Sequence, residues 1–177
     1  MKIKNIIACT LIIISFFGCK DKAFETTTET ETIALKITVD LVAKESDNFC
    51  LLYTEDGSIN FGNKGIWKRV VGNEQPQNVE FLFKEDAFPN QLRLDLGMNS
   101  VQEQVTINSI TFEYAGKKRV VKGTELGAFF CADTSKCTFD MNTGIATSKV
   151  VDGKRTNISL YPIQNVQAAE LPKMFNK

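Results

Sequence analysis

Two places in the sequence carry residue types that fit recognition of a sugar. Arg93 and Asp95 are two residues apart in an alternating apolar segment, so on a strand both project from one face and could hydrogen-bond a pair of hydroxyls. The alternative for this pair is a structural ion pair on a solvated sheet. Trp67 is the only tryptophan, and its ring could either stack on the apolar face of a pyranose or be buried in the core.

Three further candidates lie in or just before a polar stretch at residues 55–65. Tyr53 precedes this stretch, and Asp56 and Asn60 lie within it. Loops held by a rigid scaffold often carry binding residues, although Asp, Asn and Gly also form turns without any binding role. The predicted ligand-binding residues are therefore Tyr53, Asp56, Asn60, Trp67, Arg93 and Asp95.

The sequence offers few groups for catalysis. Histidine is absent, which excludes a Ser-His or Cys-His nucleophile and removes the commonest metal ligand. A sugar hydrolase needs two facing carboxylates, for which Asp95 and Glu113 are available, but most acidic residues occupy alternating exposed positions. Asp56 and Asp133 could give oxygen ligands to calcium, yet no patterned acidic loop is present. We predict no catalytic residue, no metal and no cofactor, and a small glycoside hydrolase or lyase is the enzymatic alternative.

The distribution of charge argues against a nucleic-acid partner. The chain has 21 basic and 21 acidic residues, and its folded region contains no block of like charge. Binding to a phosphate backbone needs concentrated positive charge, so we do not expect DNA or RNA to be a partner.

The five cysteines have different predicted roles. Cys9 lies in an N-terminal apolar segment, and Cys19 follows that segment directly. Cys131 and Cys137 flank a short polar loop, and we predict that they form a disulfide in an exported protein. A zinc site is the alternative for these two, but the chain has no histidine to complete it. Cys50 lies in an apolar run and is predicted to be a buried free thiol.

Apolar residues alternate along most of the chain with the period of two that is typical of β-strands. A change of phase at Asn108 and Ser109 predicts a β-bulge, Asp152-Gly153 predicts a tight hairpin, and one short helix is expected after Thr124. The predicted strands are residues 33–42, 48–54, 66–71, 78–84, 91–97, 104–114, 117–122, 146–151 and 154–161, with a weaker candidate at 138–141. This pattern predicts an all-β, antiparallel, jelly-roll-like β-sandwich of about eight or nine strands.

The N-terminal residues have the organisation of an export signal. Lys2 and Lys4 precede an uncharged apolar segment, residues 6–17, which is shorter than the about 20 residues that span a bilayer. The last two residues of this segment and the two that follow, Phe16-Phe17-Gly18-Cys19, resemble the lipobox of bacterial lipoproteins. That resemblance implies cleavage before Cys19 and stable anchoring through acyl chains on this residue. The alternative is an ordinary signal peptide followed by a chance cysteine.

The segment after Cys19 is expected to be a tether. Residues 20–31 are polar and rich in Thr and Glu, so they cannot bury enough apolar surface to fold. Lys20-Asp21-Lys22 resembles the export tags of surface lipoproteins in glycan-degrading Gram-negative bacteria, which implies display at the surface of the outer membrane. The predicted organisation is a signal peptide at 1–18, a lipidated cysteine and tether at 19–31, a β-sandwich at 32–162 and a tail at 163–177.

Four segments of the predicted sandwich together resemble a known type of module. They are Tyr53-Thr54, Phe81-Leu82-Phe83, residues 92–97 (Leu-Arg-Leu-Asp-Leu-Gly) and residues 107–112 (Ile-Asn-Ser-Ile-Thr-Phe). Across residues 33–122 the chain resembles a carbohydrate-binding-like β-sandwich module of bacterial envelope and polysaccharide-related proteins. The resemblance implies a non-catalytic lipoprotein that binds a glycan or polysaccharide and contacts the bilayer through Cys19. The alternative is an accessory lipoprotein that docks to an outer-membrane protein complex.

Overall fold

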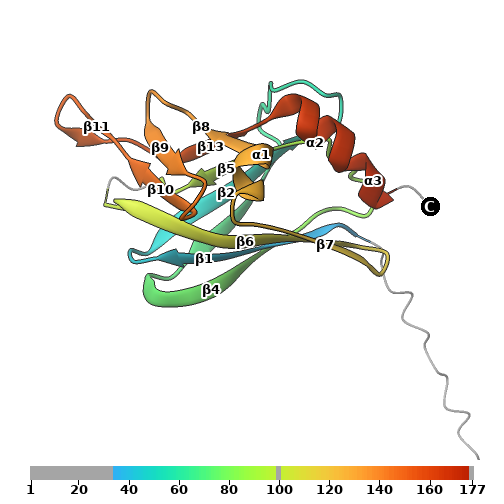
Figure 1. Ribbon diagram of the computed structural model, residues 1–177, viewed down its shortest axis with the longest axis horizontal. Helices are drawn as coiled ribbons and strands as arrows, with labels where there is room; N and C mark the ends of the chain where they lie inside the picture. Colours follow the sequence, from blue (N-terminus) through green and yellow to red (C-terminus); the bar gives the residue numbers. More distant parts are fainter. Residues whose placement is uncertain (1–33, 99–100, 176–177) are drawn as a thin grey trace, which may run out of the picture. The chain divides into compact units, whose positions relative to one another are not determined.

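The computed structural model describes residues 34–98 and 101–175 (Figure 1). These residues belong to the compact unit Thr32–Lys177. The predicted signal peptide, the lipidation site Cys19 and the tether lie outside the described residues. In chain order the elements are β1 (Lys36–Ala43), β2 (Asp47–Thr54), β3 (Gly65–Val70), β4 (Asn73–Leu82), β5 (Gln91–Leu96), β6 (Gln104–Tyr114), β7 (Lys117–Lys122), α1 (Glu125–Phe129), β8 (Phe130–Ala132), β9 (Cys137–Asp140), β10 (Ile145–Ser148), β11 (Val150–Val151), β12 (Lys154–Arg155), β13 (Ser159–Pro162), α2 (Gln164–Glu170) and α3 (Pro172–Phe175).

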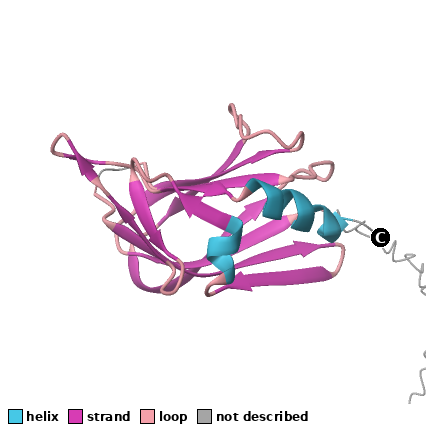
Figure 2. Cartoon of the chain, turned by 45° about the horizontal axis from the view of Figure 1, so that its top comes forward, coloured by secondary structure: helices cyan, strands magenta, loops and turns pink. Residues whose placement is uncertain are grey.

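Two antiparallel sheets form the two layers of a sandwich, as predicted (Figures 1 and 2). One sheet has the strand order β4-β1-β6-β10-β9, with β7 also paired to β6, and the other has the order β3-β2-β5-β13-β8. The chain crosses repeatedly between the layers. The described strands are more numerous than predicted, because the predicted strands 146–151 and 154–161 are divided into β10, β11, β12 and β13, and because β8 was not predicted.

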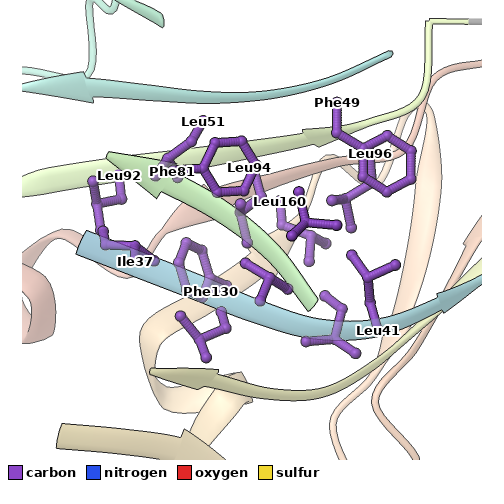
Figure 3. Close-up of a cluster of buried hydrophobic side chains, with 14 of the residues drawn as sticks. Ile37, Leu41, Phe49, Leu51, Phe81, Leu92, Leu94, Leu96, Phe130 and Leu160 are labelled. Carbon is purple, nitrogen blue, oxygen red and sulfur yellow. The ribbon is translucent and has the colours of Figure 1, made fainter. Parts of the chain in front are cut away.

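The hydrophobic core lies between the two sheets. Alternation along β1 buries Ile37, Val39 and Leu41, and Phe49 and Leu94 project from the opposite sheet to meet them. Figure 3 shows four of these side chains together in the buried cluster. Burial of each such side chain stabilises the fold by about 1.5–3 kcal/mol, so the alternating apolar pattern accounts for the layered structure.

The predicted β-bulge is present in β6. The register with β1 changes from Asp40 opposite Ser109 to Leu41 opposite Ile107, which leaves Asn108 as the extra residue. The Asn108 Nδ2 donates a hydrogen bond of 3.0 Å to Asp40 Oδ1. Before the bulge β6 pairs with β10, and after it β6 pairs with β7. The bulge therefore marks the point at which the strand paired to β6 on the side opposite β1 changes from β10 to β7.

The tail forms α2 and α3, which the sequence did not predict and which lie at one end of the sandwich (Figure 2). A single fully buried side chain of α2, Gln167, fastens this helix to β5 and α1. Its Oε1 accepts a hydrogen bond of 2.7 Å from Leu92 N, and its Nε2 donates one of 2.9 Å to Phe129 O. Arg119 of β7 adds an ion pair with Glu170. The helical tail is thus held by polar contacts as well as by apolar packing.

The predicted disulfide between Cys131 and Cys137 is not formed, because both residues are free cysteines in the structure. Cys131 is exposed on β8, whereas Cys137 is buried in β9 of the other sheet and its Sγ donates to Ser159 O at 3.3 Å. Although Cys131 and Cys137 are close in the sequence, they lie on strands of different sheets and do not form a disulfide. Cys50 is a buried free thiol, as predicted. Burial, with a further contribution from the charge of Asp95, raises the pKa of Cys50 to about 11.

Thiol labelling should distinguish these three cysteines. In native protein comprising residues 20–177 we expect only Cys131 to react with a thiol reagent at neutral pH, because Cys50 and Cys137 are buried. A spectrophotometric thiol titration should count one reactive thiol without denaturant and three with it. If the native, non-reduced protein had no reactive thiol and the denatured protein had one, the predicted disulfide would be present after all.

Candidate functional site

A groove of about 650 Å³ lies between β3 and β4, which are edge strands of different sheets. The two strands are adjacent in the chain, and the groove lies towards the Gly65 end of β3 and the Leu82 end of β4. Seven of its lining residues come from β2, β3 and the loop between them, and the β4 side supplies four more. Those with side chains suited to binding are Tyr53, Glu55, Asn63, Lys64, Trp67, Leu82, Lys84 and Asp86.

The apolar part of the groove includes two exposed side chains. Trp67 is 55% exposed and Leu82 is 60% exposed. The alternative that Trp67 belongs to the core is therefore wrong. Tyr53 is half-buried and packs edge-on against Phe83 with 4.9 Å between the ring centroids. An exposed indole beside an open groove can stack against the apolar face of a flat ligand.

Charged side chains of both signs surround these apolar groups. Glu55 Oε1 accepts a hydrogen bond of 2.9 Å from Phe88 N, and its Oε2 lies 3.4 Å from Lys64 Nζ. Such an exposed ion pair contributes little to stability. Lys84 and Asp86 have no ion pair or side-chain hydrogen bond with any other described residue. Their donors and acceptors are available to a polar ligand.

A smaller hollow of about 280 Å³ adjoins the groove, and the two share Glu55 and Lys64 as lining residues. Asp56 and Asn60 line this hollow. Asp56 Oδ1 accepts a hydrogen bond of 3.0 Å from Ser58 N, and the hydrogen bonds from the amide and hydroxyl of Ser58 lower the pKa of Asp56. Asp56 is consequently ionised at neutral pH and shapes the turn at the edge of the hollow.

Arg93 and Asp95 form a bidentate ion pair and line neither the groove nor the adjoining hollow. The Nε and Nη2 atoms of Arg93 donate to the two carboxylate oxygens of Asp95 at 2.8 and 3.0 Å. The guanidinium carbon lies 4.5 Å from the ring centroid of Tyr161, against which the buried Phe61 of the 55–64 loop also packs. This cluster holds the loop against the outer face of the sheet, which matches the structural alternative for the pair.

The structure therefore brings four of the predicted site residues together and leaves two apart. The groove includes Tyr53 and Trp67, the adjoining hollow includes Asp56 and Asn60, and neither includes Arg93 or Asp95. Lys84 and Asp86 were not predicted. Their only signal in the sequence is the charged run Lys84-Glu85-Asp86, which looks like an ordinary solvated turn.

The side chains of the described part of the chain do not indicate a metal site. Across residues 34–98 and 101–175, no three or more His, Cys, Asp or Glu side chains are grouped so that they could hold a metal ion. Of the helices in those two ranges, none is long and apolar enough to cross a membrane.

Comparisons of this chain with protein-family models, with curated proteins and with solved structures found no match.

Proposed function

We propose that this protein is a non-catalytic lipoprotein, anchored in the outer membrane through Cys19 and displayed at the cell surface, whose β-sandwich binds glycan in the groove between β3 and β4. The anchor and its location rest on the lipobox-like sequence at residues 16–19 and the charged start of the tether. The observation that carries the binding function is the exposed indole of Trp67 beside a groove of about 650 Å³.

The composition of the groove supports a sugar ligand over a purely apolar one. A pyranose has an apolar face for the rings of Trp67 and Tyr53 and a rim of hydroxyls that both donate and accept hydrogen bonds. Lys84 supplies donors, Asp86 supplies acceptors and Asn63 supplies both. An apolar ligand would leave these polar groups without partners.

A second candidate function is docking to an outer-membrane protein complex, and the β11–β12 hairpin favours it. Val150 and Val151 are 60% and 45% exposed on this hairpin, which forms a separate two-stranded sheet. Asp152 and Gly153 both have positive φ and close it as a tight turn. Exposed valines on a well-defined hairpin can be buried against a protein partner. Co-purification with a membrane protein that survives loss of Trp67 would favour this function.

Affinity electrophoresis tests the glycan-binding proposal. Protein comprising residues 20–177 is run through gels that contain one complex polysaccharide each, and we expect at least one polysaccharide to retard it. The variant Trp67→Ala should lose most of this retardation, because it removes the stacking surface, worth about 1–3 kcal/mol for a buried aromatic face.

Val150→Ala is the matched control, since it removes exposed apolar surface on the hairpin and not in the groove. It should be retarded like the wild type. Thermal unfolding should show that both variants are folded. Absence of retardation by every polysaccharide tested would contradict the proposal.

A further inference from the structure

We infer that the groove selects glycans that contain N-acetylated amino sugars, because its walls are free strand edges that can pair with a secondary amide. This inference rests on the proposed glycan-binding function and adds a ligand class to it. It is carried by the hydrogen-bonding pattern of β3 and β4.

At the edge of β3 that lines the groove, some backbone N–H and C=O groups point away from β2, the strand to which β3 is paired. Tyr53 N donates to Lys64 O at 3.1 Å, so Tyr53 and Lys64 are a hydrogen-bonded pair in the antiparallel register of β2 and β3. Hydrogen-bonded and non-hydrogen-bonded pairs alternate along such a ladder. Gly65 and Trp67 are therefore in non-hydrogen-bonded positions, and their N–H and C=O groups point to the free edge.

The edge of β4 shows the same arrangement on the opposite wall. Phe83 N donates to Leu35 O at 2.9 Å, and the next pair in the register is Lys36 with Leu82. By the same alternation, the N–H and C=O of Leu82 point away from β1. No hydrogen bond from another described residue reaches the edge groups of Gly65, Trp67 or Leu82.

A secondary amide complements these edge groups. Each outward-facing residue presents one donor and one acceptor along the strand, which is the pattern that a neighbouring strand meets with its own C=O and N–H. The acetamido group of an N-acetylated amino sugar carries the same trans N–H and C=O, attached to a ring that can stack on Trp67. An unsubstituted hexose has hydroxyls but no such amide.

An extended peptide is the other ligand with such amides, and the groove favours the sugar. Only Gly65 and Trp67 of β3 present outward-facing groups within the groove, which suffices for one or two amides but gives a very short ladder for an added strand. The exposed indole of Trp67 and the unpaired Lys84 and Asp86 suit a ring bearing hydroxyls.

Isothermal titration calorimetry with two matched oligosaccharides tests the inference. The full chain, purified in detergent, is titrated with the β-1,4-linked tetramer of N-acetylglucosamine and with the β-1,4-linked tetramer of glucose, which differ in the acetamido groups. We expect the acetylated tetramer to bind at least tenfold more tightly. Trp67→Ala should lose binding to it, and Val150→Ala should keep it.

The outcomes separate this inference from the proposed function. Equal affinity for the two tetramers, or binding of neither by a protein that a polysaccharide gel retards, would overturn the acetamido preference and leave glycan binding in place. Binding of an extended peptide at the groove with no binding of either tetramer would also overturn it. Failure to bind any glycan would overturn both.

Discussion

Replacing the buried Gln167 with leucine should lower the free energy of unfolding by about 1–3 kcal/mol. Leucine has a similar volume but cannot hydrogen-bond, so Leu92 N loses its acceptor in a fully buried site, whereas Phe129 O keeps the hydrogen bond of 2.9 Å that it accepts from Ile163 N. A buried polar group without a partner costs about 1–3 kcal/mol. Chemical denaturation of residues 20–177 measures this change, and the C-terminal helices should become more susceptible to proteolysis.

Gln164→Leu is the control for this prediction. Gln164 lies on the same helix, but its side chain is exposed, so the same substitution should change the free energy of unfolding by less than about 0.5 kcal/mol. Equal effects of the two substitutions would mean that Gln167 does not fasten α2 to β5 and α1.

Gly144→Ala should destabilise the protein by about 2 kcal/mol or more. Gly144 has a φ of +72°, and a Cβ at this position would lie 2.2 Å from the carbonyl oxygen of Ile107. That oxygen belongs to the backbone of β6, and Ile107 N donates to Gly144 O at 2.8 Å, so β6 and the turn before β10 cannot move apart without loss of this hydrogen bond. The midpoint of thermal unfolding should fall accordingly.

Gly153→Ala separates the steric overlap from the backbone strain. Gly153 has a φ of +73°, close to that of Gly144, but no atom lies within 4 Å of the position that its Cβ would take. Left-handed backbone alone costs a non-glycine residue about 1–2 kcal/mol. If Gly144→Ala were no more destabilising than Gly153→Ala, the close approach to Ile107 would have no energetic consequence.

The strands could be predicted because their apolar residues alternate. Ile37, Val39 and Leu41 recur with a period of two, and every second residue of β1 is buried. Even the bulge in β6 was visible, because an extra residue shifts the phase of this alternation at Asn108. The local alternation of apolar residues was therefore sufficient to predict most of the strands.

The C-terminal helices could not be predicted for an equally local reason. The fully buried residue of α2 is the polar Gln167, so the segment has no apolar stripe that would indicate a helix packed on the core. Its burial depends on backbone groups of Leu92 and Phe129, which are far away in the sequence. The division of Cys131 and Cys137 between two sheets likewise depends on tertiary structure.

The candidate site was predictable only in part. Tyr53 and Trp67 stood out as aromatic residues next to a polar loop, and both line the groove. Lys84 and Asp86 reach it because the fold places the end of β4 beside β3, a relation that residue spacing does not contain. The spacing of Arg93 and Asp95 predicted a shared face correctly, but these residues bind each other.

The fluorescence of Trp67 tests the central claim most directly. Trp67 is the only tryptophan in the chain, so its emission reports on the groove without interference from other indoles. Titration with a polysaccharide that retards the protein in a gel should produce a saturable blue shift, because a stacked sugar ring excludes water from the exposed indole. Retardation by a polysaccharide that leaves the emission of Trp67 unchanged would contradict glycan binding in this groove.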